Sequence, residues 1–225
     1  MTTQKSTHYS GAQGTTYYEY LQAVTPDAKA QIMLRKFREI LPATRDCVID
    51  FGCGDGSFVS LIDSQRRIGV DVIAENREAA ANKGLEVYES LKEIDDSTAD
   101  LVTSHHVLEH TLYPLNELKE ILRVLKDSGI LLLVVPADDW RVNGTYDATD
   151  VNHHLYTWTP LALGHLLKEA GFHVSTCQME HKGLPGRLTV PLAKRLSERQ
   201  FGWVMRATAI ARRRREILAA ATKAN

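Results

Sequence analysis

The stretch that decides the fold is Cys47-Val-Ile-Asp-Phe-Gly-Cys-Gly-Asp-Gly-Ser-Phe-Val59. A short apolar run ends at Phe51, and three glycines follow at alternate positions, Gly52, Gly54 and Gly56. Glycine is needed where the backbone must turn sharply and approach a ligand closely. Apolar residues then recur at helical spacing up to Ile62. The stretch therefore predicts a buried strand, a tight glycine turn and a helix.

A second short strand is predicted just downstream, where Ile68-Gly-Val-Asp71 follows the glycine stretch. Asp71 ends this strand, and its carboxylate could accept hydrogen bonds from both hydroxyls of a ribose. The glycine spacing is G-x-G-x-G, because Ser57 stands where the third glycine of the dinucleotide-binding pattern G-x-G-x-x-G would be. That departure disfavours an NAD-binding site.

Together, Val48 to Gly56 and Asp71 resemble the cofactor site of the class I S-adenosylmethionine-dependent methyltransferases. Within that superfamily, the chain is similar to the ubiquinone-biosynthesis O-methyltransferase type and its small-molecule and glycan-modifying relatives. The resemblance implies S-adenosyl-L-methionine as cofactor. It also implies an α/β, Rossmann-like, doubly wound sheet of seven mostly parallel strands, with helices on both faces and an antiparallel last strand.

Strands and helices are predicted to alternate along the chain, which favours a parallel sheet covered on both faces. For residues 216–222 the run of alanines favours helix, whereas the resemblance implies the last antiparallel strand, and we expect the strand. The other expected strands are 47–51, 68–72, 85–88, 99–104, 130–135 and 172–177, and the other expected helices are 27–41, 76–82, 115–125 and 161–170.

One methyltransferase domain is expected over residues 25–225, preceded by residues 1–24, which are either a lid over the site or a flexible terminus. A basic helical insertion is expected at about 189–215. The net charge is −1 overall, but ten basic and two acidic residues from Arg187 onward give that segment +8. Such a segment could pack on the sheet or on a second subunit of a homodimer, or could contact an anionic membrane surface. The overall charge balance does not indicate nucleic-acid binding.

Polar residues follow the first four predicted strands, and ligands of doubly wound sheets bind beyond the carboxyl ends of the strands. The four exits are assigned in turn to the methionine part, the ribose, the adenine edge and the surroundings of the sulfonium. For each residue the alternative is that it caps the following helix, and this alternative is strongest for Ser90. The predicted cofactor-binding residues are Asp50, Gly52, Cys53, Gly54, Gly56, Asp71, Val72, Glu89, Ser90, Ser104 and His105.

Two histidine-rich stretches are expected near the methyl acceptor. Ser104-His-His-Val-Leu-Glu-His110 resembles the segment after the fourth strand of these methyltransferases, and Asn152-His-His-Leu-Tyr-Thr-Trp158 lies on the loop that faces the substrate. Histidine has a suitable pKa for removing a proton from a hydroxyl acceptor, so His106 or His154 is the candidate catalytic base. Other residues expected to line this pocket are Asp138, Asp139, Trp140 and Arg141.

A metal site was the alternative use of these histidines, namely His105, His106, His110, His153 and His154. We expect no metal, because no carboxylate or cysteine spacing in the sequence completes a ligand set.

The sequence thus favours a methyltransferase that acts on a small-molecule, lipid-linked or glycan acceptor, most plausibly on oxygen. The alternatives are an NAD-dependent oxidoreductase and a non-catalytic binding protein with a vestigial cofactor fold. Cys47, Cys53 and Cys177 form no C-x-x-C pair, and neither a secretory signal nor an apolar run of membrane-spanning length is visible. We therefore expect reduced thiols and a cytoplasmic protein, which the basic C-terminal segment could hold at a membrane surface.

Overall fold

A computed structural model describes residues 46–137, 145–181 and 215–224 without a break. It also describes single residues in the two flanking regions, namely Tyr9, Gly14, Ala30, Gln31, Met33, Leu34, Phe37, Ile40, Leu41, Arg195, Leu196, Ser197, Gln200, Trp203, Val204 and Ala207.

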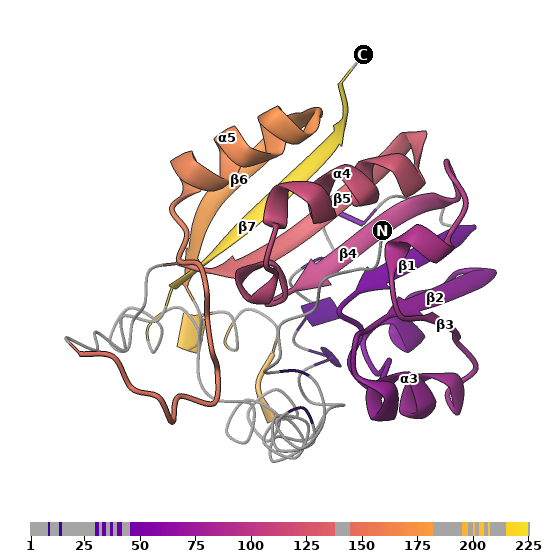
Figure 1. Cartoon of the computed structure of the whole chain (residues 1–225), viewed down its shortest axis with the longest axis horizontal. Coiled ribbons are helices and arrows are strands. Elements are labelled where there is room, and N and C mark those ends of the chain that lie inside the picture. Colours follow the sequence, from indigo (N-terminus) through magenta and orange to yellow (C-terminus); the bar gives the residue numbers. More distant parts are fainter. Residues whose placement is uncertain are drawn as a thin grey trace.

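Seven strands form one sheet in the order β3-β2-β1-β4-β5-β7-β6 (Figure 1). All pairings among β1 to β5 are parallel, whereas β7 runs antiparallel to both β5 and β6. The predicted fold class and the antiparallel last strand are therefore confirmed. The strands are β1 (Cys47–Phe51), β2 (Arg66–Val70), β3 (Glu86–Tyr88), β4 (Ala99–His105), β5 (Leu125–Pro136), β6 (Phe172–His181) and β7 (Arg215–Lys223).

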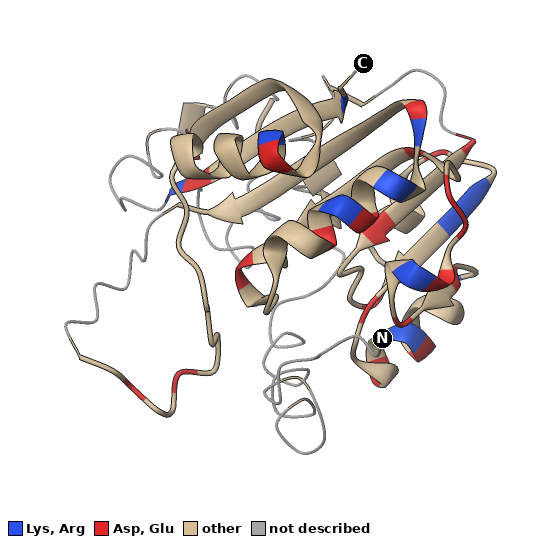
Figure 2. Ribbon diagram, turned by 45° about the horizontal axis from the view of Figure 1, so that its top comes forward, with Lys and Arg blue, Asp and Glu red and all other residues tan. Residues whose placement is uncertain are grey.

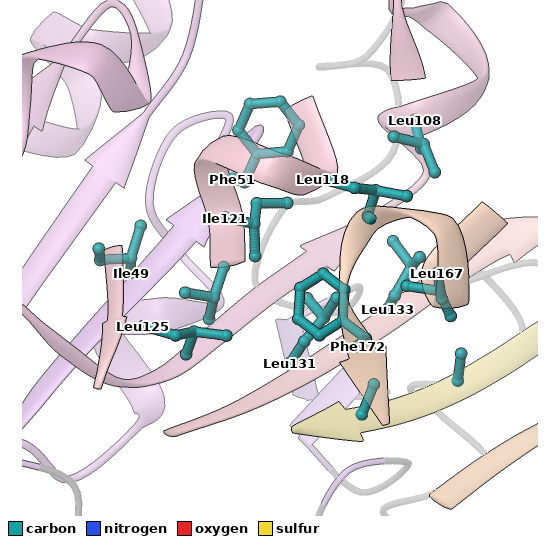
Figure 3. Close-up of a cluster of buried hydrophobic side chains, with 14 of the residues drawn as sticks. Ile49, Phe51, Leu108, Leu118, Ile121, Leu125, Leu131, Leu133, Leu167 and Phe172 are labelled. Carbon is teal, nitrogen blue, oxygen red and sulfur yellow. The ribbon is translucent and has the colours of Figure 1, made fainter. Parts of the chain in front are cut away.

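Helices cover both faces of the sheet, as predicted. Helices α4 (Pro114–Val124) and α5 (Pro160–Ala170) lie side by side on one face (Figure 1), and α3 (Ala74–Ala81) packs on the other. Alternate residues of β5 enter the two cores: Leu131 and Leu133 pack with α4 and α5 (Figure 3), whereas Leu132 packs on the opposite side with Ala80 of α3. Burial on both faces explains why the central strands are mostly apolar.

Strand order reverses between β1 and β4, because β2 and β3 extend to one side of β1 and the remaining strands to the other. The carboxyl ends of β1, β2 and β4 therefore meet at the topological switch point, where ligands bind in sheets of this kind. This edge carries the predicted polar strand exits.

The predicted helix after the glycine turn is wrong. Only Val59–Leu61 form a single turn of 3-10 helix, η2, and Ile62 is already extended. The hydroxyl of Ser64 donates to the carbonyls of Asp46 and Arg66, so the chain is tied back to the start of β2 before an α-helix can continue. The apolar spacing reflects a different contact: Phe58 packs against Phe37, with ring centroids 5.7 Å apart.

The described residues of the flanking regions agree in part with the sequence. Ala30, Gln31, Met33, Leu34 and Phe37 are helical, as expected for residues 27–41. In the basic segment, Trp203 is helical but 74% exposed, so its side chain is not buried against the sheet. Most of residues 1–24 and 189–214 lies outside the described residues, and the proposed lid, membrane contact and homodimer remain predictions.

Acidic and basic residues are interspersed over α4 and over the β1–β3 side of the sheet (Figure 2). Among the residues that the structure describes, no helix is both long and apolar enough to cross a membrane.

The packing of the helices on the sheet predicts that two leucines on neighbouring helices contribute very differently to stability. Leu118 of α4 is fully buried, whereas Leu161 of α5 is 71% exposed. Leu118→Ala should cost about 2–5 kcal/mol of unfolding free energy and lower Tm by roughly 2–4 °C per kcal/mol. Leu161→Ala should leave Tm nearly unchanged. Thermal melts followed by circular dichroism test this, and equal Tm values for the two variants would contradict the packing described here.

Candidate active site at the carboxyl edge of the sheet

The three glycines of the turn differ in how closely other residues pack against them. Gly52, Gly54 and Gly56 all have positive φ, at 79°, 53° and 76°. A Cβ on Gly52 would collide with Val107, and one on Gly56 would lie 3.0 Å from Ala80. Among the residues that the structure describes, none lies within 4 Å of a Cβ placed on Gly54. Gly52 and Gly56 therefore serve packing, whereas Gly54 presents bare backbone to an open space, as a close-fitting ligand requires.

Asp71 anchors this turn. Its carboxylate accepts one hydrogen bond from the backbone N–H of Gly54 and another from that of Ile73, each at 2.9 Å. The guanidinium of Arg77 donates to the backbone carbonyl of Asp71 at 2.7 Å. Burial raises the pKa of Asp71, and the hydrogen bonds from Ile73, Asn76 and Gly54 oppose that shift. Asp71 thus fastens the glycine turn to the segment that begins α3.

Asp50, the acidic residue inside β1, is 3% exposed. The hydroxyl of Thr103 donates to its carboxyl group at 2.7 Å. Burial, together with the nearby charge of Asp71, raises the pKa of Asp50 to about 7, and the hydrogen bond from Thr103 opposes this shift. A cation placed beside this carboxyl would favour its ionised form.

The rest of the turn is held rigidly. The thiol of Cys53 is buried, which raises its pKa, and it donates to the Gly54 carbonyl at 3.3 Å. Asp55 accepts hydrogen bonds from the backbone and hydroxyl of Ser57 and forms an ion pair with Lys83 at 2.6 Å. These contacts leave the open space at Gly54 well defined.

At the exit of β3, one predicted residue is used for local structure. Ser90 caps the 3-10 helix η3 (Leu91–Glu93), where it accepts from the backbone of Lys92 and forms a capping box with Glu93. Glu89 lies 3.4 Å from the guanidinium of Arg77, and half-buried Val72 lies at the bend before α3. The structure thus shows the capping alternative for Ser90, while Arg77 joins the exits of β2 and β3.

The exit of β4 carries two adjacent histidines. Ser104 is fully buried, and among the described residues its hydroxyl finds no hydrogen-bond partner. The rings of His105 and His106 lie 4.5 Å apart, edge to face. His106 has a φ of 57°, and its backbone N–H donates to Val134 at 2.8 Å. A left-handed backbone is uncommon for histidine and is typical of functional sites.

Two buried carboxylates flank His106. Its Nδ1 lies 3.2 Å from Oε1 of Glu109, and its Nε2 lies 3.4 Å from Oε2 of Glu216. Glu109 is fully buried and Glu216 is 1% exposed. Glu109 belongs to the 3-10 helix η4 (Leu108–His110), and Glu216 comes from β7. Sequence reasoning missed Glu216, although it is an acidic residue directly before the apolar run Ile217–Ala221.

The second histidine pair completes this group. Nε2 of His110 lies 3.7 Å from Oε1 of Glu109, and the rings of His110 and His154 are 4.8 Å apart. On its other side, Nδ1 of His110 lies 2.6 Å from the hydroxyl of Tyr9, which also donates to the carbonyl of Asn152 at 3.4 Å. We call His105, His106, Glu109, His110, His154 and Glu216 the histidine–carboxylate cluster.

The remaining residues predicted for the acceptor pocket divide into two groups. Trp158 is buried in the core beneath α5 and stacks on Tyr156 at 5.6 Å, which agrees with the packing alternative. The other group lies outside the described residues: Asp138, Asp139, Trp140 and Arg141.

Comparison with known proteins identifies the family. The methyltransferase domain family model matches residues 23–176, which is more than half of the chain. An uncharacterized protein of Methanocaldococcus jannaschii is 35% identical over 94 residues, covering 41% of each chain. The thiol S-methyltransferase TMT1B of Rattus norvegicus is 28% identical over 137 residues, covering 52% of this chain and 56% of the rat protein. The chain therefore spans about half of the length of these curated relatives.

A solved structure from Thermotoga maritima, described as an S-adenosylmethionine-dependent methyltransferase and possible histamine N-methyltransferase, shares the fold. Its TM-score is 0.66 at 16% identity, with 93% of this chain and 97% of that chain covered. None of these matches supports the NAD-dependent or the non-catalytic alternative, and none singles out the ubiquinone-biosynthesis type. The chain belongs to the methyltransferase domain family.

Proposed function

We propose that this protein transfers the methyl group of S-adenosylmethionine to a hydroxyl group of a small-molecule, lipid-linked or glycan acceptor. The observation that carries this proposal is the open backbone at Gly54, held by Asp71 beside the buried carboxyl of Asp50. When bound, the cofactor supplies a methyl group on a sulfonium, which the acceptor oxygen displaces in line.

Each part of the cofactor has a matching group at this edge. The carboxylate of Asp71, which follows β2, would accept from the ribose hydroxyls. Asp50 would face the ammonium of the methionine part, where a positive charge compensates its burial. Glu89 and the backbone at Ser90 would border the adenine. His105, at the end of β4, would lie near the sulfonium.

We assign the acceptor to the histidine–carboxylate cluster because this cluster adjoins the glycine turn. Val107, which lies between His106 and Glu109 in the sequence, packs so closely on Gly52 that a Cβ at that position would collide with it. A hydroxyl acceptor must lose a proton as the O–CH₃ bond forms, and an imidazole can take it. Both ring nitrogens of His106 already face carboxylate oxygens, so this ring is engaged with Glu109 and Glu216. His154 is therefore the better placed of the two proposed bases.

A test of the ribose assignment uses Asp71→Asn. The amide has only one oxygen, so it cannot accept from Gly54, Ile73 and a ribose together. Loss of one or two such hydrogen bonds, at ~1–3 kcal/mol each, should weaken cofactor binding by about one to three decades. Asp127→Asn is the matched control, since the Asp127 side chain is fully exposed. Unchanged affinity of a folded Asp71→Asn protein in calorimetry would remove Asp71 from the site.

Proton release should accompany cofactor binding. With a pKa of about 7, Asp50 is partly protonated at neutral pH, and an adjacent ammonium would favour the carboxylate. Affinity should therefore rise as pH increases from about 6 to 7.5, below the range in which an α-amino group titrates. Calorimetry in buffers of different ionisation enthalpy would count the released protons. Asp50→Asn should abolish the release; a release that persists in this variant would show that another group supplies the proton.

The acceptor class can be tested directly with radiolabelled cofactor and matched sets of phenols, alcohols, thiols and amines. We expect label in hydroxyl compounds, because an imidazole beside the acceptor is suited to removing a hydroxyl proton as the O–CH₃ bond forms. His154→Ala should lower turnover by ~10²–10⁴ while cofactor affinity changes little. Transfer to thiols alone, the acceptor class named for the rat relative, would overturn the assignment to oxygen.

A further inference from the structure

Glu109, His110 and His154 are arranged as a ligand set for a metal ion. Each offers one ligand atom, and these three atoms lie within 4.8 Å of one another. Oε1 of Glu109 is 3.7 Å from Nε2 of His110 and 3.2 Å from Nδ1 of His106. Ligand atoms that share one ion at about 2.0–2.2 Å lie at similar separations from one another, so the group needs little movement to close around a cation.

The outer contacts orient the histidines for this role. Because the hydroxyl of Tyr9 donates to Asn152, it accepts from Nδ1–H of His110 at 2.6 Å. In the neutral ring this leaves the lone pair of Nε2 facing the carboxylate of Glu109, an arrangement that a cation between them would stabilise. Oε1 of Glu109 is itself held in place by Nδ1 of His106 at 3.2 Å, and the other ring nitrogen of His106 faces Glu216. Metal-binding histidines usually have such orienting acceptors.

We propose that Glu109, His110 and His154 bind a divalent transition-metal ion. Two imidazole nitrogens and one carboxylate oxygen suit Zn²⁺ and its neighbours in the first transition row, whereas Mg²⁺ and Ca²⁺ prefer oxygen ligands. The sequence argued against a metal because no carboxylate spacing completed the set. The fold supplies Glu109 by folding η4 back on His106, and it supplies Glu216 from β7.

A second triple, His105, His106 and Glu216, also has its ligand atoms within 4.8 Å. One observation favours the Glu109 set: within the described part of the chain, the hydroxyl of Tyr9 orients one of its histidines, His110. In this arrangement Glu216 positions His106 and does not bind the ion. If the Glu109 set is the binding site, replacing Glu109 should weaken metal binding more than replacing Glu216, and if the Glu216 set is the site, the order should be reversed.

A metal here would also change how the acceptor is activated, and this consequence rests on the proposed function. An ion bound to the acceptor oxygen lowers the pKa of that hydroxyl and orients it. His154 would then act as a ligand rather than as a base. The cluster adjoins the glycine turn through Val107 and Gly52, so an acceptor held by the ion would lie beside the cofactor site.

The test is a titration of the metal-stripped full chain with Zn²⁺, and in parallel with Mg²⁺, by calorimetry without cofactor. We expect one Zn²⁺ per chain and much weaker binding of Mg²⁺. Replacement by Co²⁺ should give visible absorption with the intensity of a four- or five-coordinate site. Glu109→Gln and His154→Ala should each weaken Zn²⁺ binding at least 100-fold, whereas Glu216→Gln should weaken it by about 10–100-fold, as for an orienting partner.

His165→Ala is the matched control, since His165 is an exposed imidazole on α5; it should bind Zn²⁺ as the parent does. A lack of stoichiometric Zn²⁺ binding would overturn the proposal. It would also be overturned if Glu216→Gln lost Zn²⁺ binding while Glu109→Gln kept it. If the Glu109→Gln protein does not fold because position 109 is buried, the test rests on His154→Ala, because His154 is only half-buried. Cofactor affinity, measured separately, distinguishes the two proposals: Asp71→Asn should lose S-adenosylmethionine and still bind Zn²⁺.

Discussion

The buried carboxylate of Asp71 is the constraint on which the rest of the site depends. One of its oxygens holds the backbone of Gly54 and the other holds Ile73, so a single side chain fixes the turn after β1 and the entry to α3. Its own backbone carbonyl is held by Arg77, which also reaches Glu89 at the exit of β3. Three strand exits are thereby joined through one residue. Burial of the charge is unfavourable, and the hydrogen bonds offset part of that cost.

Buried acidic groups are the common feature of this edge of the sheet. All four of Asp50, Asp71, Glu109 and Glu216 are buried. Buried carboxylates are stable only when they are neutralised or paired. In our proposal the two halves of the site meet this requirement with different positive groups. Asp50 and Asp71 would face a ligand that carries a sulfonium and an ammonium, whereas Glu109 and Glu216 lie beside imidazole rings and Glu109 would also bind the proposed metal ion.

Local patterns predicted most of the fold. The apolar run before the glycines gave β1 with its observed bounds, and Thr159-Pro160 and Gly171 delimited α5, where Thr159 caps the first turn and Gly171 adopts φ 102°. The short η2 was missed because the tie from Ser64 depends on the neighbouring strand. β7 was predicted from family resemblance against the helical preference of its alanines; its pairing with two strands outweighs that preference.

The site was less predictable, because its decisive contacts join residues far apart in the chain. Glu216 is 110 residues from His106, and Tyr9 is 101 residues from His110. Neither pair has a spacing that a motif could reveal. The glycine turn and Asp71 were accessible because they follow consecutive strands, whereas Ser90 shows how a polar strand exit can serve a local cap instead.

The position of β7 bears on how the molecule is assembled. This strand follows all the others in the chain, yet it inserts between β5 and β6 and is the source of Glu216. On a ribosome, the glycine turn and both of its carboxylates emerge well before β7 is made. Because long-range strand pairing forms slowly, the nascent chain can organise its nucleotide-binding half first. The histidines acquire their second carboxylate only when the sheet is complete, which couples the finished catalytic centre to finished folding.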